Sequence, residues 1–379
     1  MSMVIGFDAK RAFRNNTGLG NYSRMLVCSL ASSHQDVQSI LYAPQMSGYY
    51  KTFFSCYANI STRQPRGWRA LFPSLWRGFG ISRHLKGDKV DIYHGLSHEL
   101  PHFIPSRIRR VVTIHDLVAW RYPKYLGTLE AAIHRMKMRH SCKNADVVVA
   151  ISEQTKRDII KFMHIPESKI RVLYQSCDEI FWEPVTPEQI ASVRDTYHLP
   201  DNYIICVGTV EERKNQLNLV EAVAQLSDDV HLVIVGRGRG SYGNDLKRLV
   251  SARGLVNRVH WLHNVEFNDF PALYAASRAA AYVSRFEGFG IPILEAMCSG
   301  SVVLTSNCSS MPEVGGDAVL YADPENADEI AQQLTRLWTD EALRADLRNR
   351  SRERIQQFTH EKISHDFYQL YTELYNRKD

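Results

Sequence analysis

The segment AAAYVSRFEGFGIPILEAMCSG, residues 279–300, reads as a buried strand, a glycine-rich turn and a helix. Pro292 suits the first helical position, where its missing N–H costs no hydrogen bond, and Gly300 suits the position just past the helix end. The helix is therefore predicted to begin beside Glu287 and to carry Glu295 in its first turn. A strand that feeds a helix through a short turn is typical of α/β folds.

The turn in this segment has the chemistry for a ligand with both phosphates and hydroxyls. The helix N-terminus offers unpaired N–H groups and a partial positive charge, and Gly288 and Gly290 let the backbone approach a diphosphate. Glu287 and Glu295 would accept hydrogen bonds from sugar hydroxyls. An acidic residue near a helix N-terminus is common in any case, but that explains Glu295 alone.

Short apolar runs that indicate buried strands alternate with helical stretches along the whole chain. Continuous apolar runs between helices are typical of parallel sheets covered on both faces. A chain of 379 residues is long for a single core, which rarely exceeds about 250–300 residues. We therefore expect an α/β protein with two doubly wound, Rossmann-like domains. The strands are predicted at 3–7, 39–43, 90–95, 110–117, 146–152 and 171–175, then at 203–210, 231–236, 259–262, 279–284, 301–306 and 318–322.

The polar segment 176–190, SCDEIFWEPVTPEQI, separates the two series of strands and is the predicted linker. We therefore expect an N-terminal domain at 1–178 and a C-terminal domain at 179–360. From about residue 361, the stretch EKISHDFYQLYTELY has the apolar spacing of an amphipathic helix.

The composition, 44% hydrophobic and 23% charged, is that of an ordinary globular protein. No apolar run approaches the roughly 20 residues of a membrane-spanning helix, and the start, MSMVIGFDAKRAF, has a short strand-like run in place of a signal peptide. The seven cysteines are scattered and include no C-x-x-C pair, which indicates free thiols in a reducing compartment. We expect a cytoplasmic protein.

Charge is distributed unevenly along the chain. Residues 1–175 contain 26 Lys and Arg against 11 Asp and Glu, a balance of +15, whereas residues 176–379 contain 20 against 30, a balance of −10. A basic field of this size attracts anionic partners such as phosphorylated substrates, nucleic acid or an anionic membrane surface. Because no nucleic-acid motif accompanies the charge, we do not expect nucleic-acid binding.

Residues 66–86, RGWRALFPSLWRGFGISRHLK, interleave aromatic side chains with arginines. This pattern is typical of peripheral membrane contact and also of core aromatics flanked by solvated arginines. Together with the basic first half, it favours contact with the inner face of the cytoplasmic membrane. The aromatic residues are Trp68, Phe72, Trp76 and Phe79, and the arginines are Arg66, Arg69, Arg77 and Arg83.

Ligands of open α/β sheets gather at the carboxyl ends of strands, so the turns there are candidate sites. After the first strand, Gly18 and Gly20 open a helix and would let phosphate or a substrate approach the backbone. After the strand at 203–210, Gly208 is followed by Arg213 and Lys214. The planar guanidinium of an arginine and the compact ammonium group of a lysine suit a diphosphate and would stabilise it as a leaving group. Both patterns also occur in ordinary surface turns.

Histidines are concentrated in the first half. His115 and Asp116 lie at the end of the strand at 110–117, and Asp116 could orient the histidine ring. Lone histidines are usually structural, and several of His94, His98 and His102 are expected to be so. No group of Asp and His has metal-ligand spacing.

Glu287 and Glu295, separated by seven residues around a glycine-containing loop, resemble the signature of the retaining glycosyltransferases of family 4 (group 1). The T-G-L-G loop at 17–20 and the G-x-x-x-x-x-K spacing from Gly208 to Lys214 are similar to motifs of that family. The resemblance spans nearly the whole chain. It implies a GT-B fold, in which two Rossmann-like domains face a central cleft and the last helix returns to the N-terminal, acceptor-binding domain.

The resemblance also implies roles for individual residues. Glu287, His115, Arg213 and Lys214 would take part in catalysis, with Glu287 and His115 beside the donor sugar. The donor would be bound through Gly18, Gly20, Gly208, Arg213, Lys214, Gly288, Phe289, Gly290 and Glu295, of which Arg213 and Lys214 meet the diphosphate and Glu295 the ribose.

The implied reaction is transfer of a hexose from a nucleotide sugar to a glycan or glycolipid, with retention and without a metal cofactor. The TIHDL context and the run PKYLG at 123–127 are most similar to bacterial mannosyltransferases of surface-polysaccharide synthesis. This favours GDP-mannose and a polyprenyl-diphosphate-linked acceptor. The alternatives are a UDP-sugar donor, a GT-B epimerase or phosphorylase, hydrolysis by the carboxylate pair, and a nonenzymatic glycan-binding protein.

Overall fold

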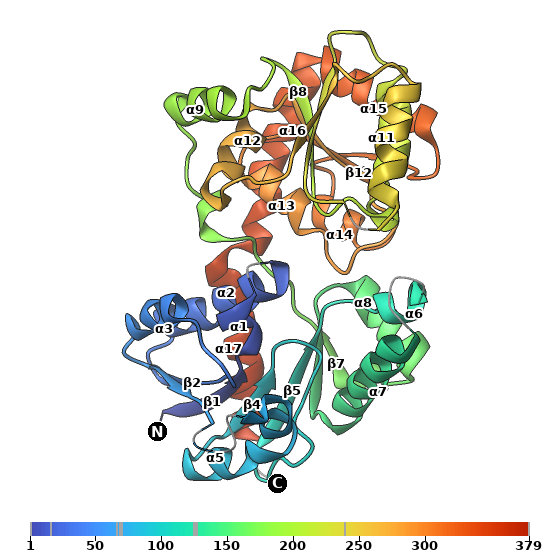
Figure 1. The fold of residues 1–379 in the computed structure, drawn as a ribbon. Coiled ribbons are helices and arrows are strands. Elements are labelled where there is room, and N and C mark those ends of the chain that lie inside the picture. The colour runs from blue at the N-terminus through green and yellow to red at the C-terminus, as the bar shows by residue number, and fades with distance from the viewer. Residues whose placement is uncertain are drawn as a thin grey trace. The chain divides into compact units, whose positions relative to one another are not determined.

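The computed structural model describes residues 2–15, 17–65, 67, 71–123, 128–238 and 240–377. The chain divides into two compact units: unit 1 contains residues 1–176 and 358–379, and unit 2 contains residues 177–357. Each unit is a parallel sheet with helices on both faces (Figure 1). The two predicted Rossmann-like sheets are thereby confirmed. The predicted boundaries, after residues 178 and 360, lie close to these divisions.

The described residues of unit 1 form a seven-stranded sheet in the order β3-β2-β1-β4-β5-β6-β7. β1 pairs with β2 on one side and with β4 on the other. β2 and β3 therefore extend the sheet to one side of β1, and β4 to β7 extend it to the other, so the topological switch point lies between β1 and β4. The strands are β1 Met3–Asp8, β2 Val37–Tyr42, β3 Ile60–Arg63, β4 Ile92–Gly95, β5 Arg109–Ile114, β6 Val147–Ala150 and β7 Ile170–Val172.

Unit 2 has a six-stranded sheet in the order β10-β9-β8-β11-β12-β13. Here β8 pairs with β9 on one side and with β11 on the other. The topological switch point of this sheet therefore lies between β8 and β11. The strands are β8 Tyr203–Val207, β9 His231–Val235, β10 Val259–Leu262, β11 Ala279–Tyr282, β12 Val303–Ser306 and β13 Leu320–Ala322.

Helices connect the strands in both units. In unit 1 they are α1 Lys10–Arg14, α2 Gly18–Ser33, α3 Gly48–Ser55, α4 Pro73–Leu75, η2 Trp76–Gly80, α5 Ser82–Gly87, α6 Val118–Arg121, α7 Thr128–Asn144, α8 Glu153–Asp158, η4 Ile159–Met163, η5 Glu167–Lys169 and α17 His360–Asn376. From residue 177 to the division at 357 they are η6 Glu179–Phe181, α9 Pro187–Tyr197, η7 Glu212–Lys214, α10 Gln216–Val223, α11 Tyr242–Ala252, η8 Phe267–Asp269, α12 Phe270–Ala276, α13 Ile291–Cys298, α14 Met311–Gly315, α15 Ala327–Thr339, α16 Glu341–Arg354 and η9 Ile355–Phe358.

The strand β3 was not predicted. Its sequence, ISTR, contains one large apolar residue, and it lies at the sheet edge, where it pairs only with β2 among the described strands. An edge strand buries little side-chain surface and can be polar. The predicted linker at 176–190 contains the division between the units at 176–177, but η6 and the first turn of α9, which lie in the same segment, belong to unit 2.

The C-terminal helix α17 completes the core of unit 1. Phe367, Leu370 and Tyr371 are buried in that core, and α17 packs along α2. The Tyr371 hydroxyl lies 2.7 Å from Nδ1 of His94, which ties the helix to the end of β4. The last helix therefore packs on the N-terminal sheet, as the family resemblance implied.

None of the helices in the described part of the chain combines the length and apolar composition needed to cross a bilayer. All seven cysteines are free in the structure.

Candidate active site

The carboxyl edge of the unit 2 sheet has its topological switch point between β8 and β11. Ligands of open α/β sheets bind in the crevice at such points. The turn after β8 contains Arg213 and Lys214, and the turn after β11 contains Glu287. Residues far apart in sequence are therefore brought to one edge of the sheet.

Glu287 forms ion pairs with both cations. Its Oε2 lies 2.7 Å from Nη1 of Arg213, and its Oε1 lies 2.8 Å from Nζ of Lys214. Arg213 also contacts Glu211 at 2.7 Å and donates to the carbonyl of Phe286 at 2.7 Å. Three of the residues to which the resemblance assigned the sugar and the diphosphate, Glu287, Arg213 and Lys214, thus form one cluster, in which both oxygens of Glu287 face a cation.

This cluster fixes the charge state of Glu287. Burial raises the pKa of the carboxyl group, but Lys214 and Arg213 outweigh burial and lower the pKa to about 2. Burial lowers the pKa of the Arg213 guanidinium, because it disfavours the charged form. The negative charges around it, Glu287 first among them, have the larger effect and raise that pKa. Glu287 is therefore a fixed anion at neutral pH, unsuited to donating a proton.

Lys214 is positioned by the last residue of β11. Its Nζ contacts the hydroxyl of Tyr282 and lies 4.6 Å from the centre of that ring. Asn215, whose φ is +64°, donates to the carbonyls of Val283 (3.1 Å) and Pro324 (2.6 Å). These contacts hold the turn after β8 against the turn after β11. Tyr282 and Asn215 were not predicted as site residues: Tyr282 lies within the strand predicted at 279–284, and Asn215 directly follows Lys214.

Two serines hold the backbone of the Glu287 turn. The hydroxyl of Ser309 donates to the carbonyl of Glu287 (2.8 Å) and accepts from its N–H (3.1 Å). The hydroxyl of Ser310 donates to the carbonyl of Phe289 (2.7 Å). Both serines lie in the turn after β12, next to β11 in the sheet. The same rule of strand-end turns would have found them.

Glu295 lies in α13 but not in its first turn, so that prediction was wrong. Gly290 caps the helix with a φ of +113°, and the helix begins at Ile291, which makes Pro292 the second residue and Glu295 the fifth. The hydroxyl of Tyr274 donates to Glu295 at 3.3 Å. Burial raises the pKa of Glu295 to about 7.

The turn between the two glutamates presents mainly backbone. Phe289 is 2% exposed, so its ring is buried and does not face a ligand. Gly290 requires its positive φ, which a larger residue would adopt with strain. Gly208, which follows β8, has a φ of +141° for the same reason.

In unit 1, Gly18 and Gly20 form the start of α2. Oδ1 of Asn15 accepts from the N–H groups of Thr17 (2.8 Å) and Gly20 (3.2 Å), so an uncharged side chain caps this helix. A Cβ on Gly20 would lie 1.7 Å from the Asn15 carbonyl oxygen, whereas a Cβ on Gly18 would meet nothing within 4 Å. Gly20 is therefore required by the fold, but Gly18 is not.

His115 lies just past the end of β5 and is 6% exposed. Its Nε2 donates to the carbonyl of Leu96 at 2.9 Å, which leaves Nδ1 as the acceptor. Burial lowers its pKa to about 4. His115 is therefore a neutral imidazole, and the Leu96 contact fixes its tautomer. Asp116 accepts from the N–H of Val118 at 3.1 Å.

His94 is a structural residue, as expected of several histidines. Its Nε2 lies 2.8 Å from the hydroxyl of Thr113, which lies 3.0 Å from that of Tyr22.

Between β1 and β4, the switch point of this sheet, Arg77 pairs with Asp8 at 2.5 Å and with Glu99 at 3.1 Å. The unit 1 switch point therefore also carries paired charges.

The aromatic residues of 66–86 have different surroundings. Trp76 is buried (2% exposed), whereas Phe72 and Phe79 are each 51% exposed. Trp68, Arg66 and Arg69 lie outside the described residues, as do residues 124–127 of the PKYLG run. Trp76 is thus a core aromatic, whereas the two phenylalanines, among the described aromatic residues of this segment, have the exposure that membrane contact requires.

Among the residues that the structure describes, no three His, Cys, Asp or Glu side chains are grouped so that they could hold a metal ion.

Comparison with known proteins gives matches over both units. Residues 194–354 match the family model described as "Glycosyl transferases group 1", and residues 17–179 match "Glycosyltransferase Family 4". The chain is 30% identical to O-antigen chain mannosyltransferase B of Escherichia coli over 368 residues, which cover 92% of this chain and 94% of the relative. It is 30% identical to O-antigen chain mannosyltransferase RfbU of Salmonella typhimurium over 225 residues, 59% of this chain and 60% of the relative.

Solved structures share the fold at low identity. The structure of HepE of Anabaena in complex with UDP-glucose has a TM-score of 0.77 at 19% identity, covering 98% of this chain and 100% of that chain. The structure of WaaG, a glycosyltransferase involved in lipopolysaccharide biosynthesis, has a TM-score of 0.69 at 18% identity, with the same coverage of 98% and 100%. The chain belongs to the group 1 glycosyltransferases of family 4 and has the GT-B fold.

Proposed function

We propose that the protein transfers mannose from GDP-mannose, with retention, to a glycan or polyprenyl-diphosphate-linked oligosaccharide in bacterial surface-polysaccharide synthesis. The observation that supports a sugar-nucleotide reaction best is the cluster of Arg213, Lys214 and Glu287 at the switch point of unit 2. It combines cations for a diphosphate with an anion for hydroxyls, where α/β sheets bind ligands.

The relatives support mannose as the transferred sugar. The chain is 30% identical over 92% of its length to a protein named as an O-antigen chain mannosyltransferase. Other relatives, 28% identical over 247 residues, are named as serotype-specific mannosyltransferases of Escherichia coli. Their names also support a growing glycan as the acceptor.

The reaction would depend on electrostatics and positioning. Arg213 and Lys214 would stabilise the negative charge that develops on the leaving diphosphate. Glu287 would hold both cations in place and accept a hydrogen bond from a hydroxyl of the donor sugar. Because its pKa is about 2 and both of its oxygens face cations, it is poorly suited to act as acid or nucleophile. A departing phosphate oxygen would then take the acceptor's proton on the same face, which gives retention without a covalent intermediate.

Other residues would bind the remaining parts of the substrates. Glu295, held by Tyr274, would accept hydrogen bonds from the ribose hydroxyls, and the backbone of Gly208 and of residues 288–290 would meet the diphosphate and sugar. In unit 1, the loop with Gly18 and Gly20 would face the substrates. Nδ1 of neutral His115 would accept a hydrogen bond from a sugar hydroxyl.

Unit 1 would contact the cytoplasmic membrane from inside the cell. The membrane face is defined by exposed apolar residues on two neighbouring parts of unit 1. The ring of Phe79 stacks on the ring of His102. The centre of the His102 ring lies 4.4 Å from that of His140 in α7. The face comprises Leu71, Phe72, Leu75, Phe79 and Phe103, together with Leu129, Ile133 and Met136 of α7.

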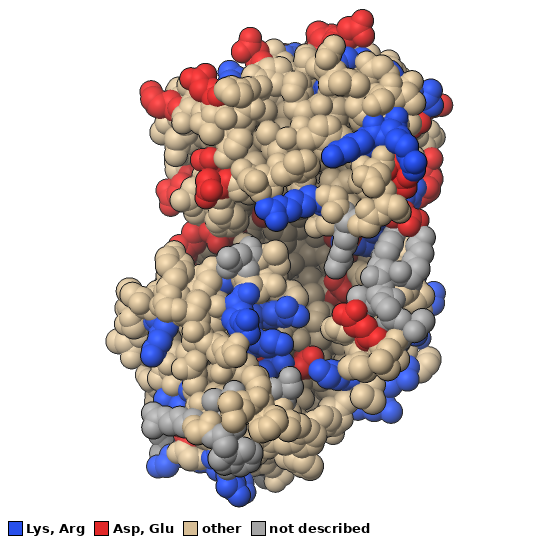
Figure 2. Space-filling view, viewed as in Figure 1, with Lys and Arg blue, Asp and Glu red and all other residues tan. Residues whose placement is uncertain are grey.

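Basic residues accompany the membrane face. Lys137, Arg139 and Lys143 are exposed on α7. Figure 2 shows further Lys and Arg side chains on the visible face of unit 1, with the largest group near α1. Apolar side chains beside basic ones are typical of surfaces that lie on anionic lipid.

The test is binding of the full-length protein to a panel of GDP- and UDP-sugars in EDTA, with Glu295→Ala as the control. Selective binding of GDP-mannose that the variant loses would support the proposal, including independence from metal. Preference for a UDP-sugar would replace the donor, and turnover of the donor without an acceptor would indicate an epimerase or a hydrolase. Absence of all nucleotide-sugar binding would contradict the proposed reaction.

A further inference from the structure

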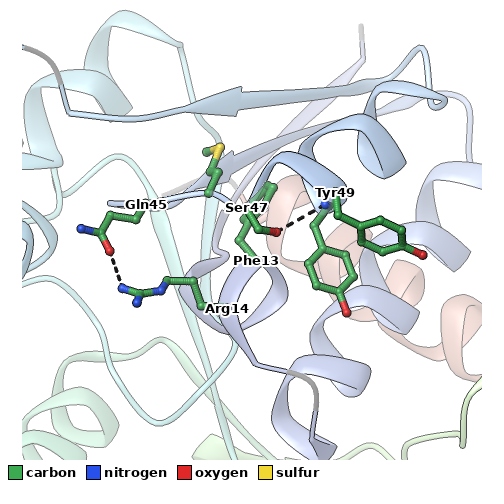
Figure 3. Close-up of a pocket in the computed structure, with 7 residues that line it drawn as sticks. Phe13, Arg14, Gln45, Ser47 and Tyr49 are labelled. Carbon is green, nitrogen blue, oxygen red and sulfur yellow. Dashed lines mark hydrogen bonds between the residues drawn. The ribbon is translucent and has the colours of Figure 1, made fainter. Parts of the chain in front are cut away.

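A pocket of about 590 Å³ opens in unit 1 (Figure 3). It lies beside the carboxyl ends of β1 and β2, between α1 and the start of α3. Its lining includes Arg14, Gln45, Met46, Ser47, Tyr49 and Tyr50. The volume and the position at a sheet edge are those of small-ligand sites in α/β proteins.

Contacts among three helices hold the pocket in shape. The hydroxyl of Ser47 accepts from the N–H of Tyr50 at 3.4 Å and so caps α3. The guanidinium of Arg24, from α2, lies 4.3 Å from the centre of the Tyr50 ring. It also donates to the carbonyls of Ala12 and Asn15, both at 2.9 Å, at the end of α1. The pocket is therefore preformed.

The pocket has one aromatic ring that packing does not explain. The side chain of Tyr49 is 74% exposed, although it stands edge-on to Tyr50, with ring centres 5.0 Å apart. Aromatic rings that combine an apolar face with a polar tip are favoured at binding sites. The C–H face of a pyranose ring matches such an aromatic surface.

The polar groups of the pocket suit hydroxyls better than phosphates. The guanidinium of Arg14 contacts the side-chain oxygen of Gln45 (Figure 3), and the amide of Gln45 and the hydroxyl of Ser47 are uncharged. No carboxylate is among the described residues that line the pocket. Arg14, held by the Gln45 amide, is a poor diphosphate site because no second cation accompanies it. The hydrogen-bond donors and acceptors of these planar groups instead match the hydroxyls at the edge of a sugar ring.

We infer that this pocket binds a neutral sugar ring of the acceptor, an assignment that rests on the proposed transferase function. Tyr49 would stack on the ring, and Arg14, Gln45 and Ser47 would hydrogen-bond its hydroxyls. The pocket would then contribute to acceptor selection, while the donor is bound by the separate cluster in unit 2.

The experiment uses the full-length protein with Tyr49→Ala, Tyr49→Phe and Gln45→Ala, and with Tyr375→Ala as a control on α17. Mannobiose is the acceptor, and the donor is the nucleotide sugar that the binding panel selects. Tyr49→Ala and Gln45→Ala should each raise the acceptor KM about tenfold, with kcat and the donor Kd little changed. Tyr49→Phe should behave like the wild type because it keeps the ring. An unchanged acceptor KM in both alanine variants, with normal donor consumption, would overturn the inference.

A direct binding measurement separates this inference from the proposed reaction. Saturation-transfer NMR with methyl α-mannoside, mannobiose and the corresponding glucosides needs no turnover. If the wild type consumes no nucleotide sugar, the proposed function fails, but a saccharide signal lost in Tyr49→Ala would still support the pocket. A signal equal in the two proteins, or no signal with any saccharide, would overturn it.

Discussion

Nη1 of Arg213 lies 2.7 Å from Oε2 of Glu287, and this contact joins the turn after β8 to the turn after β11. Lys214 completes the arrangement from the same turn as Arg213, at 2.8 Å from the other carboxylate oxygen. One anion therefore separates and orients two cations at the switch point of the sheet. Removing one member of a buried ion-pair cluster leaves uncompensated charge, so these residues should affect stability as well as turnover.

Glu287→Gln should lower kcat by about two orders of magnitude or more, as expected for loss of a preorganised charge. The variant should also lose about 3 kcal/mol of unfolding free energy, because Arg213 and Lys214 lose their shared anion. GDP should raise the melting temperature more in the variant than in the wild type, since its diphosphate replaces that anion. Turnover and thermal unfolding with and without GDP measure both effects, with Glu325→Gln, an exposed partner of Arg285, as the control. Near-normal turnover would contradict the assignment of Glu287.

Lys214→Met removes the ammonium group but keeps an unbranched stem beside the Tyr282 ring. If Lys214 stabilises the leaving diphosphate, kcat should fall by about 100-fold, while the Kd for GDP-mannose changes much less, because the charge of the leaving group develops only in the transition state. Single-turnover rates and calorimetric binding of GDP-mannose separate the two quantities. Equal losses in rate and GDP-mannose affinity would instead assign Lys214 to ground-state binding.

The parallel sheets and the charged turns could be predicted from the sequence because buried parallel strands are continuous apolar runs and because ligand sites follow strand ends. The ISTR strand could not, since an edge strand needs no such run. The ion pairs of Glu287 could not be predicted from the sequence either. They depend on the pairing of β8 with β11, a tertiary contact that brings residues 213–214 to Glu287. The start of α13 was misplaced because Gly290, at a positive φ, caps the helix, and a glycine offers no side-chain signal for that role.

The stability of the protein should depend on pH through Glu295. Its pKa is raised from 4.5 to about 7 by burial, so its favourable contribution is present below pH 4.5 and lost as pH rises through 7. Glu295→Gln, which is neutral at every pH, should therefore be more stable than the wild type at pH 8, by at most about 3 kcal/mol, and equal to it near pH 4.5. Urea unfolding at the two pH values measures the difference. Glu287 does not interfere, because its contribution is lost only as pH falls towards 2. A difference that is independent of pH would contradict the raised pKa.

The membrane face should bind anionic lipid. Ile133→Asp combined with Met136→Asp places charge on the exposed side of α7, where the wild-type residues are 40% and 66% exposed. The variant should lose most of its sedimentation with phosphatidylglycerol vesicles and keep the same melting temperature. Val256→Asp, at an exposed apolar site in unit 2, is the matched control. Equal binding by the variant and the control, or equal binding to neutral phosphatidylcholine vesicles, would exclude this face as an anionic-lipid surface.

Gly18 and Gly20 should respond differently to alanine. Gly20→Ala places a Cβ 1.7 Å from the Asn15 carbonyl oxygen, so the start of α2 must shift, and we expect a loss of about 2 kcal/mol or more from a strained backbone. Gly18→Ala meets no atom within 4 Å and replaces glycine at the first position of α2, so stability should be unchanged or up to about 1 kcal/mol higher. If the loop at 17–20 faces the substrates, Gly18→Ala should nevertheless lower kcat/KM by about tenfold, because the new methyl group occupies space that a substrate needs. Denaturant unfolding and turnover, measured on both variants, distinguish the two roles; full activity in Gly18→Ala would mean that no substrate approaches this turn closely.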